Sequence, residues 1–207
     1  MSYRYARSLP TVPAAVLLAV LGVTAAYAAT TWTVRPGGTI TATASKAALT
    51  DTTTGTTLGC SPASMSGRLN QGSGLPGTGI GSITMAAFHC SGPFGFPMLT
   101  PRGLPWHLNL TSYDASTNVS RGTISHLQLV LSGPACTAAV NGTSSTASNG
   151  VIAVTYANAT GKLKIHPAGG NLHWYHVHGC AGLVGNGDPA TLSAAYAISP
   201  PQTITSP

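Results

Sequence analysis

Apolar residues recur at every second position in short runs along this chain. The clearest runs are Leu104-Trp106-Leu108-Leu110, Leu127-Leu129-Leu131 and Leu163-Ile165. A period of two is typical of a β-strand that has one face toward a core and the other toward water. Beyond residue 28 we find no segment of convincing length with the 3.6-residue period of an amphipathic helix. The pattern therefore predicts an antiparallel all-β fold.

Segments rich in Gly, Pro, Asn and Ser separate these runs, and such residues form turns. Segment 70–79 is Gly-rich and is predicted to be a loop, and 158–161 is predicted to be a hairpin turn. Turns at intervals of roughly 8–15 residues favour a β-sandwich or a partly closed β-barrel. The ends at 30–38 and 199–207 are expected to be extended. Further strands are expected at 39–44, 80–90, 149–156, 172–180 and 191–198.

The N-terminal segment has the three parts of a secretory signal peptide. Arg4 and Arg7 are followed by an apolar stretch at 14–26, and Ala26-Tyr27-Ala28 fits the cleavage rule for small residues. The apolar stretch is short for a membrane-spanning helix. We therefore predict a signal peptide at 1–28, a single extracellular all-β domain at 29–207, and no membrane span after cleavage.

All four cysteines lie in the part predicted to be exported, at Cys60, Cys90, Cys136 and Cys180. An even number of cysteines in an oxidising compartment predicts two disulfides, and four cysteines allow three pairings. We favour Cys60–Cys90 and Cys136–Cys180, because each pair would join neighbouring strands. The spacing lacks the C-x-x-C pairs of a four-cysteine zinc site.

The shortage of acidic residues limits the catalysis that this chain can perform. Its only acidic residues are Asp51, Asp114 and Asp188, and each lies in a turn-like context. Paired carboxylates for glycoside hydrolysis would have to come from these three. The G-x-S-x-G motif of a serine nucleophile is absent. The sequence therefore predicts a protein that is not an enzyme.

The basic residues outnumber the acidic ones but form no run. Nine Lys and Arg give a formal net charge of +6, and two of the nine belong to the predicted signal peptide. Nucleic-acid binding requires clustered basic side chains that neutralise many phosphates, so we predict no nucleic-acid partner. The remaining bases are Arg35, Lys46, Arg68, Arg102, Arg121, Lys162 and Lys164.

The run 172–180 contains the most chemically suggestive cluster, with histidines at 173, 176 and 178. On a regular strand His176 and His178 would point to one face, and such a pair suits zinc or copper. Trp174 and Cys180 would share that face, so ordinary hydrogen-bonded histidines without a cofactor are the competing interpretation. A third ligand would have to come from elsewhere, such as His89 or His126.

A set of short motifs resembles a group of small exported actinobacterial proteins of the Streptomyces type. The motifs are W-T-V at 32–34 with P-G-G at 36–38, G-L-P-G at 74–77 before G-S-I-T at 81–84, G-L-P-W at 103–106, L-S-G-P at 131–134 before Cys136, and Q-T-I-T-S-P at 202–207. The resemblance implies an exported, disulfide-bonded β domain and carries no activity or catalytic residue with it.

These observations predict a non-enzymatic exported structural or interaction protein of the cell envelope or extracellular space. Its expected partner is a cell-wall or extracellular polymer or another protein, and the sequence does not specify its oligomeric state. The first alternative is a secreted metal-binding protein that uses His176 and His178. A second is an envelope-glycan-binding module that uses exposed rings such as Trp32, Trp106 or Tyr113. A third is a pore-forming assembly.

Overall fold

The computed structural model describes residues 30–93, 95 and 97–207, so the predicted signal peptide at 1–28 lies outside the described residues. Strands make up 66% of the structure, as the two-residue period predicts. No helix in the described part of the chain is long and apolar enough to cross a membrane. The strands are β1 (Thr31–Arg35), β2 (Gly38–Ala44), β3 (Ala47–Asp51), β4 (Thr57–Leu69), β5 (Gly72–Pro76), β6 (Gly81–Ser91), β7 (Met98–Arg102), β8 (Trp106–Asp114), β9 (Val119–Ser132), β10 (Cys136–Asn141), β11 (Gly150–Ala157), β12 (Lys162–His166), β13 (His173–Gly179), β14 (Ala190–Ser199) and β15 (Thr203–Thr205).

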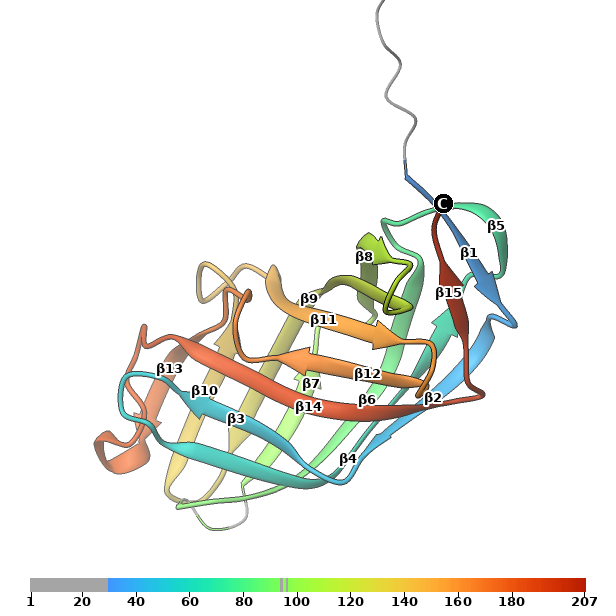
Figure 1. Ribbon diagram of the computed structural model, residues 1–207. Coiled ribbons are helices and arrows are strands. Elements are labelled where there is room, and N and C mark those ends of the chain that lie inside the picture. Colours follow the sequence, from blue (N-terminus) through green and yellow to red (C-terminus); the bar gives the residue numbers. More distant parts are fainter. Residues whose placement is uncertain (1–29, 94, 96) are drawn as a thin grey trace, which may run out of the picture.

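Eight antiparallel strands form a closed barrel (Figure 1). The ring runs β9, β11, β12, β14, β2, β4, β6 and β8, and β8 pairs with β9 again. At the opposite end of the barrel β3 takes the place of β2 between β14 and β4, and β7 takes the place of β8 between β6 and β9. Of the two architectures that the sequence favours, the structure is the barrel, and its ring is fully closed.

The long strand β9 changes partners along its length. Its first part pairs with β8 on one edge and β11 on the other, and its last part pairs with β7 and β10. Strand β13 then pairs with the free edge of β10. The barrel wall therefore continues into a sheet made of β7, β9, β10 and β13 at one end.

Both favoured disulfides are confirmed, and each joins neighbouring strands as expected. Cys60 and Cys90 lie directly opposite each other on β4 and β6, and Cys136 of β10 is bonded to Cys180 just after β13. The bonded residues are 30 and 44 positions apart. In the chain-entropy model each bond stabilises the fold by about 4 kcal/mol.

Two glycines allow the wall to bend where neighbouring backbones come close. A β-carbon at Gly67 would collide with the Ser82 carbonyl oxygen, and one at Gly122 would collide with the Asn109 carbonyl oxygen. Both glycines are on buried positions of long strands, β4 and β9. Glycines of this kind mark the tight bends of barrel walls.

The chain ends and part of the predicted loop at 70–79 form a small sheet that covers one end of the barrel (Figure 1). Strand β1 lies between β15 and β5 in this sheet. The chain ends are extended as predicted, whereas part of the segment predicted to be a loop is strand β5, and the three segments pair with one another. They are too short for alternation to reveal, and their partners are distant in sequence.

The tail that contains β15 is fixed to the barrel by a buried tyrosine. The Tyr156 hydroxyl donates a hydrogen bond to the Gln202 carbonyl oxygen at 2.8 Å and accepts one from the Gln202 amide N–H at 2.9 Å. Burial raises the pKa of Tyr156. One side chain therefore satisfies both backbone groups of a residue that is only 2% exposed.

We predict that Tyr156→Phe lowers the free energy of unfolding by about 2–4 kcal/mol, because it leaves two buried backbone groups without partners. Urea denaturation followed by circular dichroism measures the change. The matched control is Tyr113→Phe, which removes only an exposed hydroxyl bonded to Asn118. Equal effects of the two substitutions would contradict this role of Tyr156.

Candidate functional site

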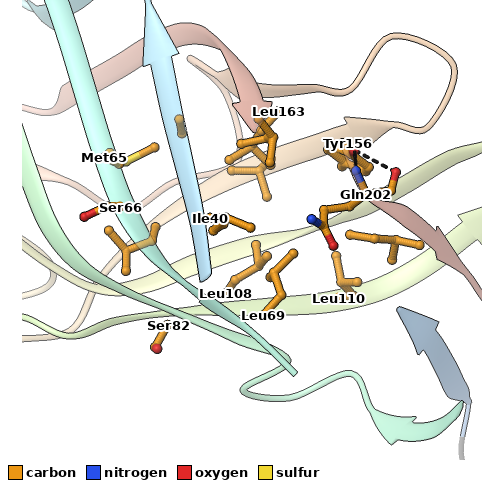
Figure 2. Close-up of a pocket in the computed structure, with 15 residues that line it drawn as sticks. Ile40, Met65, Ser66, Leu69, Ser82, Leu108, Leu110, Tyr156, Leu163 and Gln202 are labelled. Carbon is orange, nitrogen blue, oxygen red and sulfur yellow. Dashed lines mark hydrogen bonds between the residues drawn. The ribbon is translucent and has the colours of Figure 1, made fainter. Parts of the chain in front are cut away.

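The barrel interior is a filled core that contains a small void. The void encloses about 30 Å³, and Figure 2 shows its walls, which include Ile40, Leu69 and Leu163. Ligand pockets usually measure about 300–1,000 Å³, so the void is far too small for a typical ligand. The barrel is therefore a packed scaffold.

The few polar groups around this void are used within the protein. The hydroxyls of Ser66 and Ser82 point away from it in Figure 2. The Gln202 amide accepts a hydrogen bond from the Gly37 N–H and donates one to the Pro200 carbonyl oxygen, both at 2.8 Å. These bonds hold the tail across the end of the barrel.

The outer wall carries a groove of about 520 Å³, which is the size of a binding site. It crosses strands β3, β4, β12 and β14 and contains two lysines, Lys46 and Lys164. No acidic residue lines it. Its lining is Lys46, Ala47, Ala48, Gly59, Cys60, Ser61, Ser91, Lys164, Ile165, Pro167, Ser193, Ala194 and Ala195.

Strand register explains why the wall is hollowed here. Ser193 of β14 is paired with Ala48 of β3, Ala48 with Gly59 of β4, and Gly59 with Ser91 of β6. Residues paired in this way form a row across the sheet, and all members of this row have small side chains. Larger side chains beside the row stand above it, so a trough results.

The two lysines lie beside that row, on opposite sides of a small residue. Lys164 of β12 is paired with Ala195 of β14. Lys46 directly precedes Ala47, whose partner on β14 is Ala194. Both lysines are exposed. The barrel therefore brings together two cations that are distant in sequence, with little more than Ala195 between them.

The sequence did not predict this groove. In the sequence Lys46 and Lys164 are two of several scattered basic residues, and they come near each other because β14 pairs with β12 on one edge and with β3 on the other. A weak signal was present in the small residues at outward positions of β3, β4 and β14, such as Ala48, Gly59 and Ala195. A strand whose outward positions are small leaves room above it, but the sequence alone does not say which strands lie side by side.

His166 lies at the end of β12, and desolvation and the positive charge of Lys164 affect its pKa. Desolvation, followed by the charges of Lys164 and Arg121, holds its pKa below the ordinary value of 6.5. Its Nε2 lies 2.9 Å from the Thr155 hydroxyl. The strand pairing explains why both charges lie near His166, since Thr155 of β11 is paired with Lys164 on one side and with Arg121 on the other.

The expected face containing His176, His178, Trp174 and Cys180 is not formed. Trp174 and Cys180 are buried, whereas both histidines are exposed. Register shifts here, because Thr137 is paired with His178 but Ala139 with Tyr175, and His176 has a positive φ of 51°. This bulge breaks the alternation on which the prediction depended.

Metal binding by His176 and His178 stays a prediction. Among the described residues, no group of three or more His, Cys, Asp or Glu side chains is arranged to hold a metal ion. The structure does not bring His89 or His126 to this pair as a third ligand.

Two aspartates have the turn roles that their contexts predict. The Asp51 carboxylate accepts hydrogen bonds from the Thr53 and Thr54 N–H groups. The Asp114 carboxylate accepts from the hydroxyl and N–H of Ser116, and hydrogen bonds from Ser116 and Thr117 lower its pKa to about 2. Asp188 lies in the loop that precedes β14, directly after the turn at 186–187. Hydrogen bonding in turns therefore accounts for Asp51 and Asp114.

The expectation that Trp32 and Trp106 are exposed is wrong. Each is 1% exposed, because Trp32 packs beneath the small end sheet and Trp106 faces the barrel interior. Tyr113 is partly exposed, but its hydroxyl donates to the Asn118 side chain. The two tryptophan rings are thus part of the core and present no stacking surface to a sugar.

Comparison of the chain with protein-family models, curated proteins and solved structures finds no match. The protein is a disulfide-bonded antiparallel β-barrel with a filled interior and a groove on its outer wall that two lysines line.

We predict that Lys164→Gln raises the pKa of His166, because one of the charges that oppose its protonation is removed. In the unaltered protein the stabilising effect of neutral His166 is complete above pH 6.5 and is lost as the pH falls through its lowered folded-state pKa. A histidine C–H titration by NMR measures both proteins. Lys162→Gln is the control, and an equal shift in that variant would contradict the placement of Lys164.

Proposed function

We propose that this protein is a non-enzymatic exported binding protein, and that its outer groove holds an anionic group of a cell-envelope or extracellular polymer. The observation that carries this proposal is that Lys46 and Lys164 both line a groove of about 520 Å³ in which none of the described lining residues is acidic. Two ammonium groups without a neighbouring carboxylate attract an anion. Their flexible stems allow them to approach it from both sides.

The remaining lining supports an anionic ligand over a neutral one. Ser61, Ser91 and Ser193 supply hydroxyls that donate hydrogen bonds to phosphate or carboxylate oxygens. None of the described residues that line the groove has an aromatic ring on which a sugar or a nucleic-acid base could stack. The expected ligand group is therefore a phosphate or carboxylate on a flexible chain.

The same lining supports a role without catalysis. Among the described residues that line the groove there is no histidine and no carboxylate, and Cys60 is held in a disulfide. Its serines therefore lack the neighbouring histidine that commonly activates a serine nucleophile, and its lysines are exposed, whereas a nucleophilic lysine is usually desolvated. What is left is charge and hydrogen bonding, which serve binding.

Export is supported by the two disulfides, which persist in oxidising compartments, and by the predicted signal peptide. A rigid barrel with filled core suits a protein that works outside the cell. Its groove depends on strand register, so the disulfide between β4 and β6 also supports one wall of the groove.

The test is isothermal titration of the protein with inorganic polyphosphate and, separately, with polyglutamate at low ionic strength. These two probes distinguish phosphate from carboxylate as the preferred group. We predict that the double variant Lys46→Gln/Lys164→Gln binds the preferred probe about tenfold more weakly, as expected for two exposed ion pairs worth up to about 1 kcal/mol each. Added salt should weaken binding as well.

The matched control is Arg68→Gln/Arg102→Gln, which removes the same charge from exposed positions outside the groove. It should change the affinity by less than about threefold, since only long-range attraction is lost. An equal loss in both double variants would contradict a site in the groove. Tighter binding of double-stranded DNA than of either probe would contradict the proposed class of partner.

A further inference from the structure

A pair of histidines from different strands meets on the outer wall at a distance from the groove. The ring centres of His107 on β8 and His126 on β9 lie 5.0 Å apart, with their planes inclined at 73°. His107 is partly buried and His126 is exposed, so the pair is open to solvent on one side. The sequence separates the two residues and gives no H-x-H signal for them.

The backbone of β9 forms a bulge at His126. Val151 of β11 is paired with Ser125 and Gly150 with Leu127, so His126 is an extra residue without a partner on β11. Its φ is 64°, in the left-handed region that side chains other than glycine seldom adopt. Bulges of this kind redirect a side chain, and strained residues concentrate at functional sites.

On the other edge of β9, His126 lies where the partner changes from β8 to β7. His107 of β8 is paired with Ser125, and Arg102 of β7 is paired with Gln128. The bulge therefore places the His126 ring beside that of His107, which a regular strand would not do, since adjacent residues on a strand point to opposite faces.

The spacing of the two rings matches that of two imidazoles bound to one metal ion. A nitrogen about 2.0–2.1 Å from a zinc ion places its ring centre about 3.2 Å from the ion, so two rings at a tetrahedral angle have centres about 5 Å apart. The rings are inclined in an edge-to-face arrangement, and rotation of the exposed His126 ring about its bond to Cβ would turn one of its nitrogens toward the position that a His107 nitrogen can reach.

A hydrogen-bonded support lies behind the pair. His126 Nδ1 is 3.3 Å from the Ser125 hydroxyl oxygen, which leaves Nε2 free to bind a metal. The Asn109 amide donates to that hydroxyl at 3.0 Å, and its oxygen accepts from the Gly79 N–H at 2.8 Å. Histidine ligands usually have such a partner on their second nitrogen, which fixes the orientation of the ring.

We infer that His107 and His126 form a two-histidine site for a divalent transition metal such as Cu²⁺ or Zn²⁺, with water or an external ligand at the remaining positions. Imidazole nitrogens suit both ions, and copper binds most tightly in the general order of affinities. The inference is independent of the groove, because none of these residues lines it. The proposed site is also separate from the His176–His178 pair. That pair is on β13, where the register of the pairing with β10 shifts.

The test uses the protein without an affinity tag, titrated with Cu²⁺ and Zn²⁺ by calorimetry and examined by electron paramagnetic resonance with Cu²⁺. We predict one ion per chain with two coordinating imidazole nitrogens. His107→Gln and His126→Asn should each weaken binding at least tenfold and leave one coordinating imidazole. Asn is chosen at 126 because it tolerates a positive φ, so the bulge is retained.

The control is His176→Ala/His178→Ala, which should leave the affinity and the resonance spectrum unchanged. Loss of binding in that variant alone would overturn the inference in favour of the pair on β13. The absence of binding to the unaltered protein at millimolar metal would also overturn it, and would leave the His107–His126 contact as an edge-to-face aromatic interaction. Circular dichroism of each variant confirms that the fold is intact.

Discussion

The pairing of β9 with β11 closes the ring of strands, and the rest of the molecule depends on that closure. Without it the wall would be an open sheet with two unpaired edges, which are costly and prone to association. With it, apolar residues of eight strands face one interior, and every outward residue acquires a fixed neighbour. The groove and the histidine pair are both products of these neighbour relations, since each brings together residues that the sequence separates.

Closure also bears on where the proposed binding takes place. The interior is filled around a void of about 30 Å³, which supports the proposal that a ligand is bound on the outer wall. Most of that wall carries Ser, Thr and other small side chains, which offer hydroxyls but little charge. On a wall with so little charge, two lysines that line one groove make a strong local positive charge, because the chain has few acidic side chains that could neutralise them.

The sequence predicted what depends on local pattern. Alternation identified strands such as β2, β6, β11 and β14, and the even cysteine count with its spacing led to both disulfides. It did not predict barrel closure, the pairing of the chain ends with β5, or the groove, because these follow from contacts between distant segments. It also failed where a strand departs from regularity: the bulge at His176 separated a predicted cluster, and the bulge at His126 created a pair that alternation hides.

We propose that the outer groove, and not the barrel interior, is the binding surface. Amide chemical-shift mapping by NMR during titration with inorganic polyphosphate tests this proposal. Shifts are expected to concentrate at residues 46–48, 59–61, 164 and 193–195, while the amide signals of residues beside the interior void, such as Ile40 and Leu163, are expected not to shift. Shifts centred on the interior residues, or spread evenly over all basic residues, would contradict it.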